Sequence, residues 1–113
     1  ITGDRDLILQ NSNKIELTEH LFDKDALIFP NVKSNYVILN EKKAGKHIRF
    51  TFGDSPFLAI WAKPAAPFVC IEPWYGVNDS YEKATDFSKK RGIQKLSSGK
   101  EFEFSWSAEF KED

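Results

Sequence analysis

Strict alternation of apolar and polar side chains marks two segments of the chain as half-buried strands. Residues 101–110 place Glu and Ser on one face, and residues 46–52 place His47, Arg49 and Thr51 on one face. The opposite, apolar faces carry Phe102, Phe104, Trp106, Ala108 and Phe110 in the first segment and Ile48, Phe50 and Phe52 in the second. Such a period of two is typical of antiparallel sheet with one face turned to a core.

Several other segments are apolar without interruption. Residues 26–29, 36–39, 57–62 and 68–71 are short and are bounded by Pro, Gly, Asn or Asp, and residues 7–9 are similar. Short runs of this kind predict strands buried on both faces. With turn signals between the segments, we expect an all-β sandwich or barrel with about seven to nine strands. So much two-sided burial also predicts a further layer that this chain does not supply.

The helical signals are few. Residues 18–22 predict a single helical turn with Thr18 as the N-cap. Residues 79–90 are polar and predict a short helix or a loop held by Tyr81, Ala84 and Phe87. There is no internal repeat or linker, so residues 1–113 are expected to form a single unit.

Composition and charge exclude several classes of function. The 113 residues include 10 Phe and 3 Trp, which is enough for a core. The net charge of −1 leaves no basic excess for binding nucleic acid. One cysteine excludes an intrachain disulfide, and two histidines with it leave no evident zinc site. No apolar run approaches the roughly 20 residues of a membrane helix. Nothing indicates secretion, so a cytoplasmic location is expected.

The residues that can carry chemistry are concentrated in residues 68–79. A strand there delivers Glu72 out of an apolar run, and Pro73 is expected to end the strand at once. A carboxylate in such surroundings is suited to general-base catalysis. The structural alternative is a buried glutamate that pairs with Arg49 or Lys63, or that accepts a hydrogen bond from a Trp N–H.

Aromatic residues follow this carboxylate directly. Trp74 and Tyr75 can present flat faces to the C–H side of a sugar ring, or can simply pack in the core or a loop. Cys70 lies on the same strand face as Glu72 and is interpreted as a small buried apolar side chain.

The run from Phe68 to Asp79 resembles the C-terminal region of the aldose 1-epimerase (galactose mutarotase) family, particularly its LacX-type branch. Further segments resemble the same branch in the same order: LTEHLF at 17–22, DALIF at 25–29, FLAIW at 57–61, residues 86–93, and FEFSW at 102–106. The CIEPW run at 70–74 is the most specific of these. The resemblance covers nearly the whole chain.

The resemblance implies a large antiparallel β-sandwich whose members interconvert the α and β anomers of free aldoses without a cofactor. The family glutamate that removes the C1-hydroxyl proton aligns with Glu72. The family histidines and a sugar-binding arginine belong to an N-terminal half that is absent here. The resemblance therefore identifies residues 1–113 as the C-terminal part of a longer domain, whose missing half, or a partner chain, would cover the apolar strands.

The chain also departs from the family in ways that affect the substrate. His20 and His47 do not match the family's histidine motifs and receive no catalytic role. The Asp-His pair of the better-studied mutarotases is missing, and Asp25 is the nearest upstream acid; its alternative is a turn-forming aspartate. Arg49 can clamp sugar hydroxyls or a phosphate, or be a solvated surface charge. The expected ligand is a monosaccharide or a sugar phosphate.

Three functions compete at this point. The first is an aldose 1-epimerase-like isomerase of carbohydrate metabolism, in which this chain supplies Glu72 as catalytic base and Trp74, Tyr75, Asp25 and Arg49 as substrate-binding residues. The second is a non-catalytic carbohydrate-binding β-sandwich that uses Trp74, Tyr75 and Asp25. The third is a general interaction domain whose aromatic residues only form core, and the ordered set of matching segments argues against it.

Overall fold

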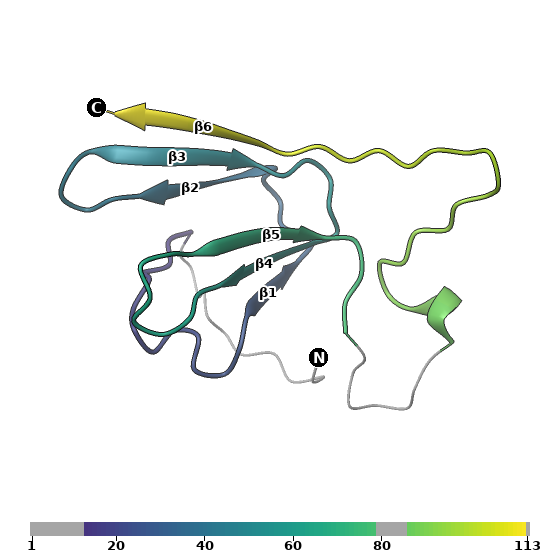
Figure 1. The fold of residues 1–113 in the computed structure, drawn as a ribbon, viewed down its shortest axis with the longest axis horizontal. Coiled ribbons are helices and arrows are strands. Elements are labelled where there is room, and N and C mark those ends of the chain that lie inside the picture. The colour runs from purple at the N-terminus through teal and green to yellow at the C-terminus, as the bar shows by residue number, and fades with distance from the viewer. Residues whose placement is uncertain (1–12, 79–85, 113) are drawn as a thin grey trace.

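The computed structural model describes residues 13–78 and 86–112, and strands dominate this part of the chain (Figure 1). Its elements are β1 (Leu27–Pro30), β2 (Tyr36–Asn40), β3 (Lys46–Thr51), β4 (Phe57–Trp61), β5 (Cys70–Trp74), the 3₁₀ helix η1 (Phe87–Lys89) and β6 (Ser107–Glu112). The all-β prediction is confirmed. The described residues hold six strands rather than seven to nine, and the strand expected at residues 7–9 lies outside them.

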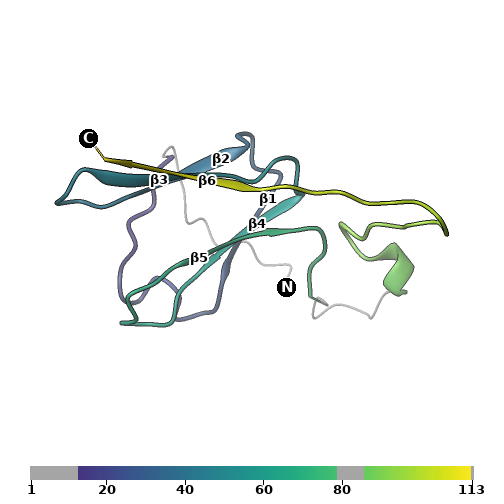
Figure 2. The same ribbon diagram turned by 45° about the horizontal axis from the view of Figure 1, so that its top comes forward.

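The strands form two antiparallel sheets of three strands each. One sheet has the order β1-β4-β5 and the other the order β2-β3-β6; we name them the β4 sheet and the β3 sheet after their central strands. Figures 1 and 2 show them as two stacked layers, with the β3 sheet above the β4 sheet. Along the chain, β1 belongs to the β4 sheet, β2 and β3 to the β3 sheet, β4 and β5 to the β4 sheet, and β6 to the β3 sheet. Neither sheet therefore forms from a continuous stretch of sequence.

The core lies between the two sheets. Phe50, Phe52 and Leu58 form a buried cluster, and Ile71 is among the partly buried residues that pack against it. The alternation predicted for residues 46–52 is confirmed, since Phe50 faces this core while Arg49 is exposed. Burial of each such side chain stabilises the fold by about 1.5–3 kcal/mol.

The prediction of two-sided burial is confirmed for β4 and wrong for β2. In β4 the consecutive residues Phe57, Leu58 and Ala59 are all buried. In β2 burial alternates, and Ile38 is 46% exposed. The reason is that the face of β2 opposite the core is covered by nothing in the described part of the chain.

Two strand boundaries also differ from the expectation. Pro73 does not end β5, which continues to Trp74 with Pro73 opposite Leu58. An edge strand tolerates a residue that has no N–H. At the C-terminal end, β6 begins only at Ser107 rather than at Glu101. Residues 101–106 continue in line with β6 but belong to no strand ladder (Figure 1).

The predicted helical turn at residues 18–22 is replaced by successive hydrogen-bonded turns. The amides of Leu21, Asp23 and Asp25 donate to the carbonyls three residues earlier. These bonds never run on into a helix. Residues 79–85, where a helix or loop was expected, lie outside the described residues; beyond them Asp86 caps η1, and Phe87 is 72% exposed and therefore does not hold this segment in the core.

Candidate functional site

Glu72 lies in the middle of β5 and faces away from the core. The preceding residue, Ile71, packs against the core cluster between the sheets. Because successive side chains of a strand point to opposite faces, Glu72 lies on the outer face of the β4 sheet. Its partner on β4 is Ala59, which is fully buried, and Glu72 itself is half-buried. The carboxylate is thus only partly exposed to solvent.

Trp74 shares this face with Glu72 and is bonded to it. The indole Nε1–H of Trp74 donates to Glu72 Oε2 over 2.9 Å. This is one of the structural alternatives foreseen for Glu72, a hydrogen bond from a Trp N–H. It does not exclude chemistry, because a carboxylate has two oxygens with about four acceptor positions. The bond to Oε2 also restricts the position of the second oxygen, Oε1.

A cationic side chain, Arg91, lies near the same face, and the sequence pattern did not indicate it. Phe57 is paired with Trp74 across the sheet, and the Arg91 guanidinium carbon lies 5.3 Å from the centre of the Phe57 ring. Arg91 is exposed, and it comes from the segment that follows the undescribed residues 79–85. Nothing in the local sequence predicts that this segment returns to β4, so only the structure reveals the contact.

Gly92 makes that return possible. It has a φ of +78°, and a Cβ built on it would lie 2.8 Å from Phe57 Cε2 and 3.0 Å from the Tyr75 carbonyl oxygen. Only a residue without a Cβ fits both the backbone conformation and the space. Gly92 therefore fixes the position of Arg91 relative to Phe57.

Tyr75 is held in a different environment from Trp74. Its hydroxyl donates to Asp54 Oδ1 over 2.9 Å, and its ring centre lies 5.1 Å from that of Phe102 and 5.7 Å from that of Phe104. Desolvation, and after it the hydrogen bond to the Asp54 carboxylate, raises the pKa of Tyr75. The sequence pattern missed Asp54, which is 21 residues away in the chain.

Asp25 lies at the other end of the β4 sheet from Trp74. Trp74 pairs with Phe57 on β4, and Phe57 pairs with Pro30, the last residue of β1. Asp25 precedes Leu27, the first residue of β1, and so lies at the opposite end of that strand. Asp25 is exposed, has a φ of 86°, and accepts a hydrogen bond from the Ala26 amide over 2.8 Å. These are the features of a turn-forming aspartate, and within this chain the structure does not bring Asp25 to Trp74.

Arg49 belongs to the other sheet. It pairs with Ile38 and Glu109 on the outer face of the β3 sheet, and its guanidinium carbon lies 4.0 Å from the centre of the Tyr36 ring. The core lies between this face and Glu72, so the structure does not bring Arg49 and Glu72 together. The pairing of Glu72 with Arg49 considered from the sequence is not formed.

The two histidines and the cysteine show no arrangement for catalysis or metal binding. His20 Nδ1 lies 3.0 Å from Asp23 Oδ2 on the surface, and His47 lies on the face of β3 opposite the core. Cys70 is half-buried, rather than buried as expected from the sequence. Among the residues that the structure describes, no group of three His, Cys, Asp or Glu side chains is placed to hold a metal ion.

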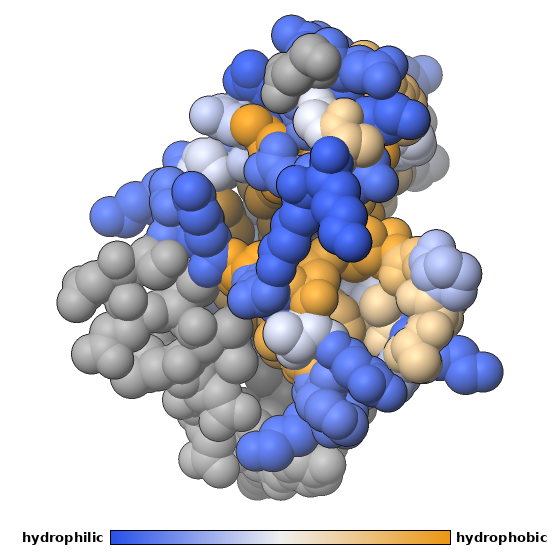
Figure 3. Space-filling view, turned by 90° about the vertical axis from the view of Figure 1, so that its left-hand side faces the viewer, coloured by the Kyte–Doolittle hydropathy of each residue, from blue (hydrophilic) through white to orange (hydrophobic). Residues whose placement is uncertain are grey.

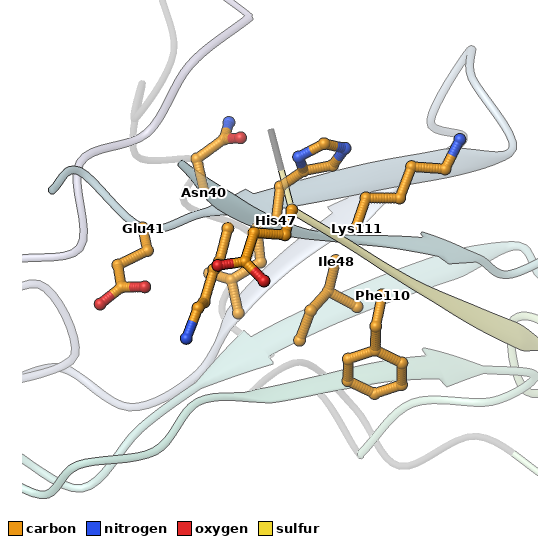
Figure 4. Close-up of a pocket in the computed structure, with 9 residues that line it drawn as sticks. Asn40, Glu41, His47, Ile48, Phe110 and Lys111 are labelled. Atoms are coloured by element: carbon orange, nitrogen blue, oxygen red, sulfur yellow. The ribbon is translucent and has the colours of Figure 1, made fainter. Parts of the chain in front are cut away.

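A hollow of about 590 Å³ opens at one end of the sandwich, and Glu72 is not among its lining residues. It is formed by the ends of β2, β3 and β6. Figure 4 shows Ile48 and Phe110 pointing toward the β4 sheet, while His47 and Lys111 point the opposite way. Figure 3, which faces this end of the molecule, shows hydrophobic residues gathered between hydrophilic ones. The hollow is therefore an uncovered part of the apolar inner face.

Comparisons with known proteins agree with the fold and the motifs. No family model matches the chain. Two LacX proteins of Lactococcus lactis subsp. lactis, one plasmid-borne and one chromosomal, are 34% identical to it over 94 residues, which are 82% of this chain and 31% of each relative. The crystal structure of a galactose mutarotase related enzyme from Lactobacillus acidophilus aligns with a TM-score of 0.77 and 35% identity, covering 86% of this chain and 33% of that one.

The match is partial on the relatives' side. The chain spans about a third of the length of the proteins it matches. No helix within the described ranges 13–78 and 86–112 is long and apolar enough to cross a membrane.

The sequence and structure comparisons together confirm the resemblance to the galactose mutarotase-like family and to its LacX-type branch. The chain corresponds to one part of such a protein, which agrees with the expected C-terminal part.

Proposed function

We propose that this chain is the C-terminal part of a longer galactose mutarotase-like sandwich that interconverts the α and β anomers of an aldose, with Glu72 as the general base. The single observation that carries the proposal is the half-buried Glu72 carboxylate on the outer face of β5, held by the Trp74 indole at 2.9 Å. The proposed ligand is a monosaccharide or a sugar phosphate, and the proposed location is the cytoplasm.

The chemistry needs one base and one acid. Glu72 takes the proton from the C1 hydroxyl of the cyclic sugar while an acid protonates the ring oxygen. The bond between C1 and the ring oxygen breaks and gives the open-chain aldehyde. Rotation about the C1–C2 bond then lets the ring close on the other face, and the two protons return. In this proposal the acid is a histidine outside this chain.

The substrate-binding residues differ in how well their positions support this role. Trp74 is hydrogen-bonded to the Glu72 carboxylate, so its position supports the role best. Tyr75 follows it in the chain but is engaged with Asp54 and the phenylalanines. Asp25 lies at the far end of the β4 sheet and Arg49 on the outer face of the β3 sheet. Their proposed contacts with a sugar therefore require a second binding site, formed by this chain or together with the rest of the protein.

Substitution of Glu72 by Gln in the full-length polypeptide tests the proposal. The glutamine keeps a carbonyl oxygen that can accept the Trp74 hydrogen bond, but it cannot take a proton. General-base contributions are typically about 10²–10⁴-fold, so the rate of anomerisation of freshly dissolved α-glucose or α-galactose should fall by that order in polarimetry. Sugar binding should remain.

A matched control separates this effect from general damage. Glu19→Gln changes an exposed carboxylate in the turns that precede β1 and should leave the rate unchanged. If Glu72→Gln retains the activity of the unsubstituted enzyme, Glu72 is not the base.

The second candidate is a sugar-binding sandwich without turnover. The observation in its favour is that the Glu72 carboxylate already has a structural partner in Trp74. It predicts that the full-length polypeptide binds sugars but leaves their rate of mutarotation at the uncatalysed value, whereas the isomerase proposal predicts acceleration.

A further inference from the structure

The segment Glu101–Trp106 leads into β6 and has no partner strand among the described residues, although the rings of Phe102 and Phe104 contact Tyr75 and Trp106 stacks on Phe50. Residues 101–106 run in line with β6 in both views of the ribbon (Figures 1 and 2). Within the described residues, no backbone hydrogen bond joins them to another segment; the turn from the Lys100 amide to the Ser97 carbonyl precedes them, and the ladder between β3 and β6 begins after them at Ser107. An extended backbone with free N–H and C=O groups is a template for strand pairing.

The side chains of this segment have the pattern of a strand that is covered on one face. Phe102, Phe104 and Trp106 alternate with Glu101, Glu103 and Ser105. Yet every residue of 101–112 is exposed, including Trp106 at 60% and Phe110 at 76%. Contiguous exposed aromatic side chains usually mark an interaction surface.

β6 has the same deficiency along its edge. It is the last strand in the order β2-β3-β6 and pairs only with β3 among the described strands. The free edge of β6 and residues 101–106 therefore form one continuous edge of about twelve residues, long enough for a complete additional strand. Natural sheets normally cover an edge of this length.

The length of the relatives indicates what covers it. The matched proteins are about three times as long as the part that corresponds to this chain. We propose that Glu101–Trp106 and the free edge of β6 pair with a β-strand of the polypeptide that makes up the remaining two thirds of the sandwich. The inference rests on the chain being part of that longer sandwich, and it does not depend on the catalytic role of Glu72.

The residues of the edge define the chemistry of the partner strand. On one face it carries apolar side chains that pack on Phe102, Phe104 and Trp106. On the other it carries Lys, Arg, Ser or Thr opposite Glu101 and Glu103, because opposite charges across a strand pair are favourable and like charges are not. A second copy of this chain would place glutamates beside glutamates in many registers, which argues against it as the occupant.

Hydrogen–deuterium exchange of the full-length polypeptide tests the pairing directly. Alternate amides of residues 101–106 should exchange at least ~100-fold more slowly than in an unstructured peptide, because paired amides exchange only when the strand opens. Exchange at unstructured rates would overturn the proposal. So would protection that disappears when a dimer is diluted to monomer, since a second copy would then be the occupant.

A pair of variants at one position sharpens the test. Glu103→Pro removes an N–H and restricts the backbone, so it should abolish the protection of residues 102–106, whereas Glu103→Ala should preserve it. Equal protection in the two variants would contradict the pairing. Hydrogen–deuterium exchange does not depend on catalytic activity, so the two proposals can fail separately. An inactive protein with a protected edge would refute only the proposed isomerase activity. An active protein with an unprotected edge would refute only the pairing.

Discussion

At the scale of single residues, the structural role of Glu72 and its proposed role as a base use the same hydrogen bond. The Trp74 indole fixes one carboxylate oxygen, and Glu72 itself is half-buried opposite the fully buried Ala59 of the neighbouring strand. A base is effective only when its oxygen is held within hydrogen-bonding reach of the proton that it removes. The hydrogen bond from Trp74, which is the structural alternative for Glu72, would therefore also hold the carboxylate in position for catalysis.

Tyr75 supports a prediction about pH. Its pKa is raised, first by desolvation and then by the Asp54 carboxylate, so the neutral phenol is favoured in the folded state. The resulting stabilisation is fully present below the ordinary pKa of about 10 and is lost as the pH rises through the raised value. In an ultraviolet titration, the phenol signal that Tyr75→Phe removes should appear above pH 10.

A second variant identifies the cause of this shift. Asp54→Asn removes the negative charge but not the burial, so it should move the Tyr75 titration only part of the way back toward the ordinary value. A Tyr75 signal at the ordinary pKa in the unsubstituted protein would contradict the prediction.

At the scale of elements, the periodicity of the sequence predicted where strands form, but it did not predict which of their faces are covered. Residues 46–51 form β3 with the faces as predicted, because alternation reports directly which side chains meet the core. The continuous apolar run at 36–39 was expected to be buried on both faces, yet Ile38 is exposed. A sequence pattern can show that a face requires cover but cannot show whether the same chain supplies it.

Gly92 allows an element-scale prediction with a built-in control. Gly92→Ala should destabilise the protein by the roughly 1–2 kcal/mol of a left-handed L-residue plus the cost of displacing Phe57 and the Tyr75 carbonyl. Gly99→Ala has a similar φ of +77° but meets nothing within 4 Å, so it should lose only the first part. Denaturant unfolding of the full-length variants measures both, and equal losses would show that the close approach at Gly92 is unimportant.

At the scale of the whole molecule, the contacts that build the site come from segments far apart in sequence. The period of two placed Cys70 and Glu72 on one strand face, but Trp74 shares that face only because β5 continues past Pro73. The approach of Arg91 to Phe57 and of Asp54 to Tyr75 does not follow from the period of two, because it depends on how loops cross between the two sheets. The positions of Asp25 and Arg49 on separate parts of the fold could not be derived from the sequence for the same reason.

The last prediction concerns what this chain can do alone. It contains the proposed base but, in the proposed mechanism, no acid for the ring oxygen, since His20 pairs with Asp23 on the surface and His47 lies on the far face of the β3 sheet. The 113-residue chain by itself should therefore leave the mutarotation of an aldose at its uncatalysed rate in polarimetry, while the full-length polypeptide accelerates it. Circular dichroism typical of β-sheet should accompany the measurement, so that loss of fold is not mistaken for lack of an acid. Full activity of the folded chain alone would mean that the acid is within these residues, and His20→Asn and His47→Asn would then identify which histidine supplies the proton.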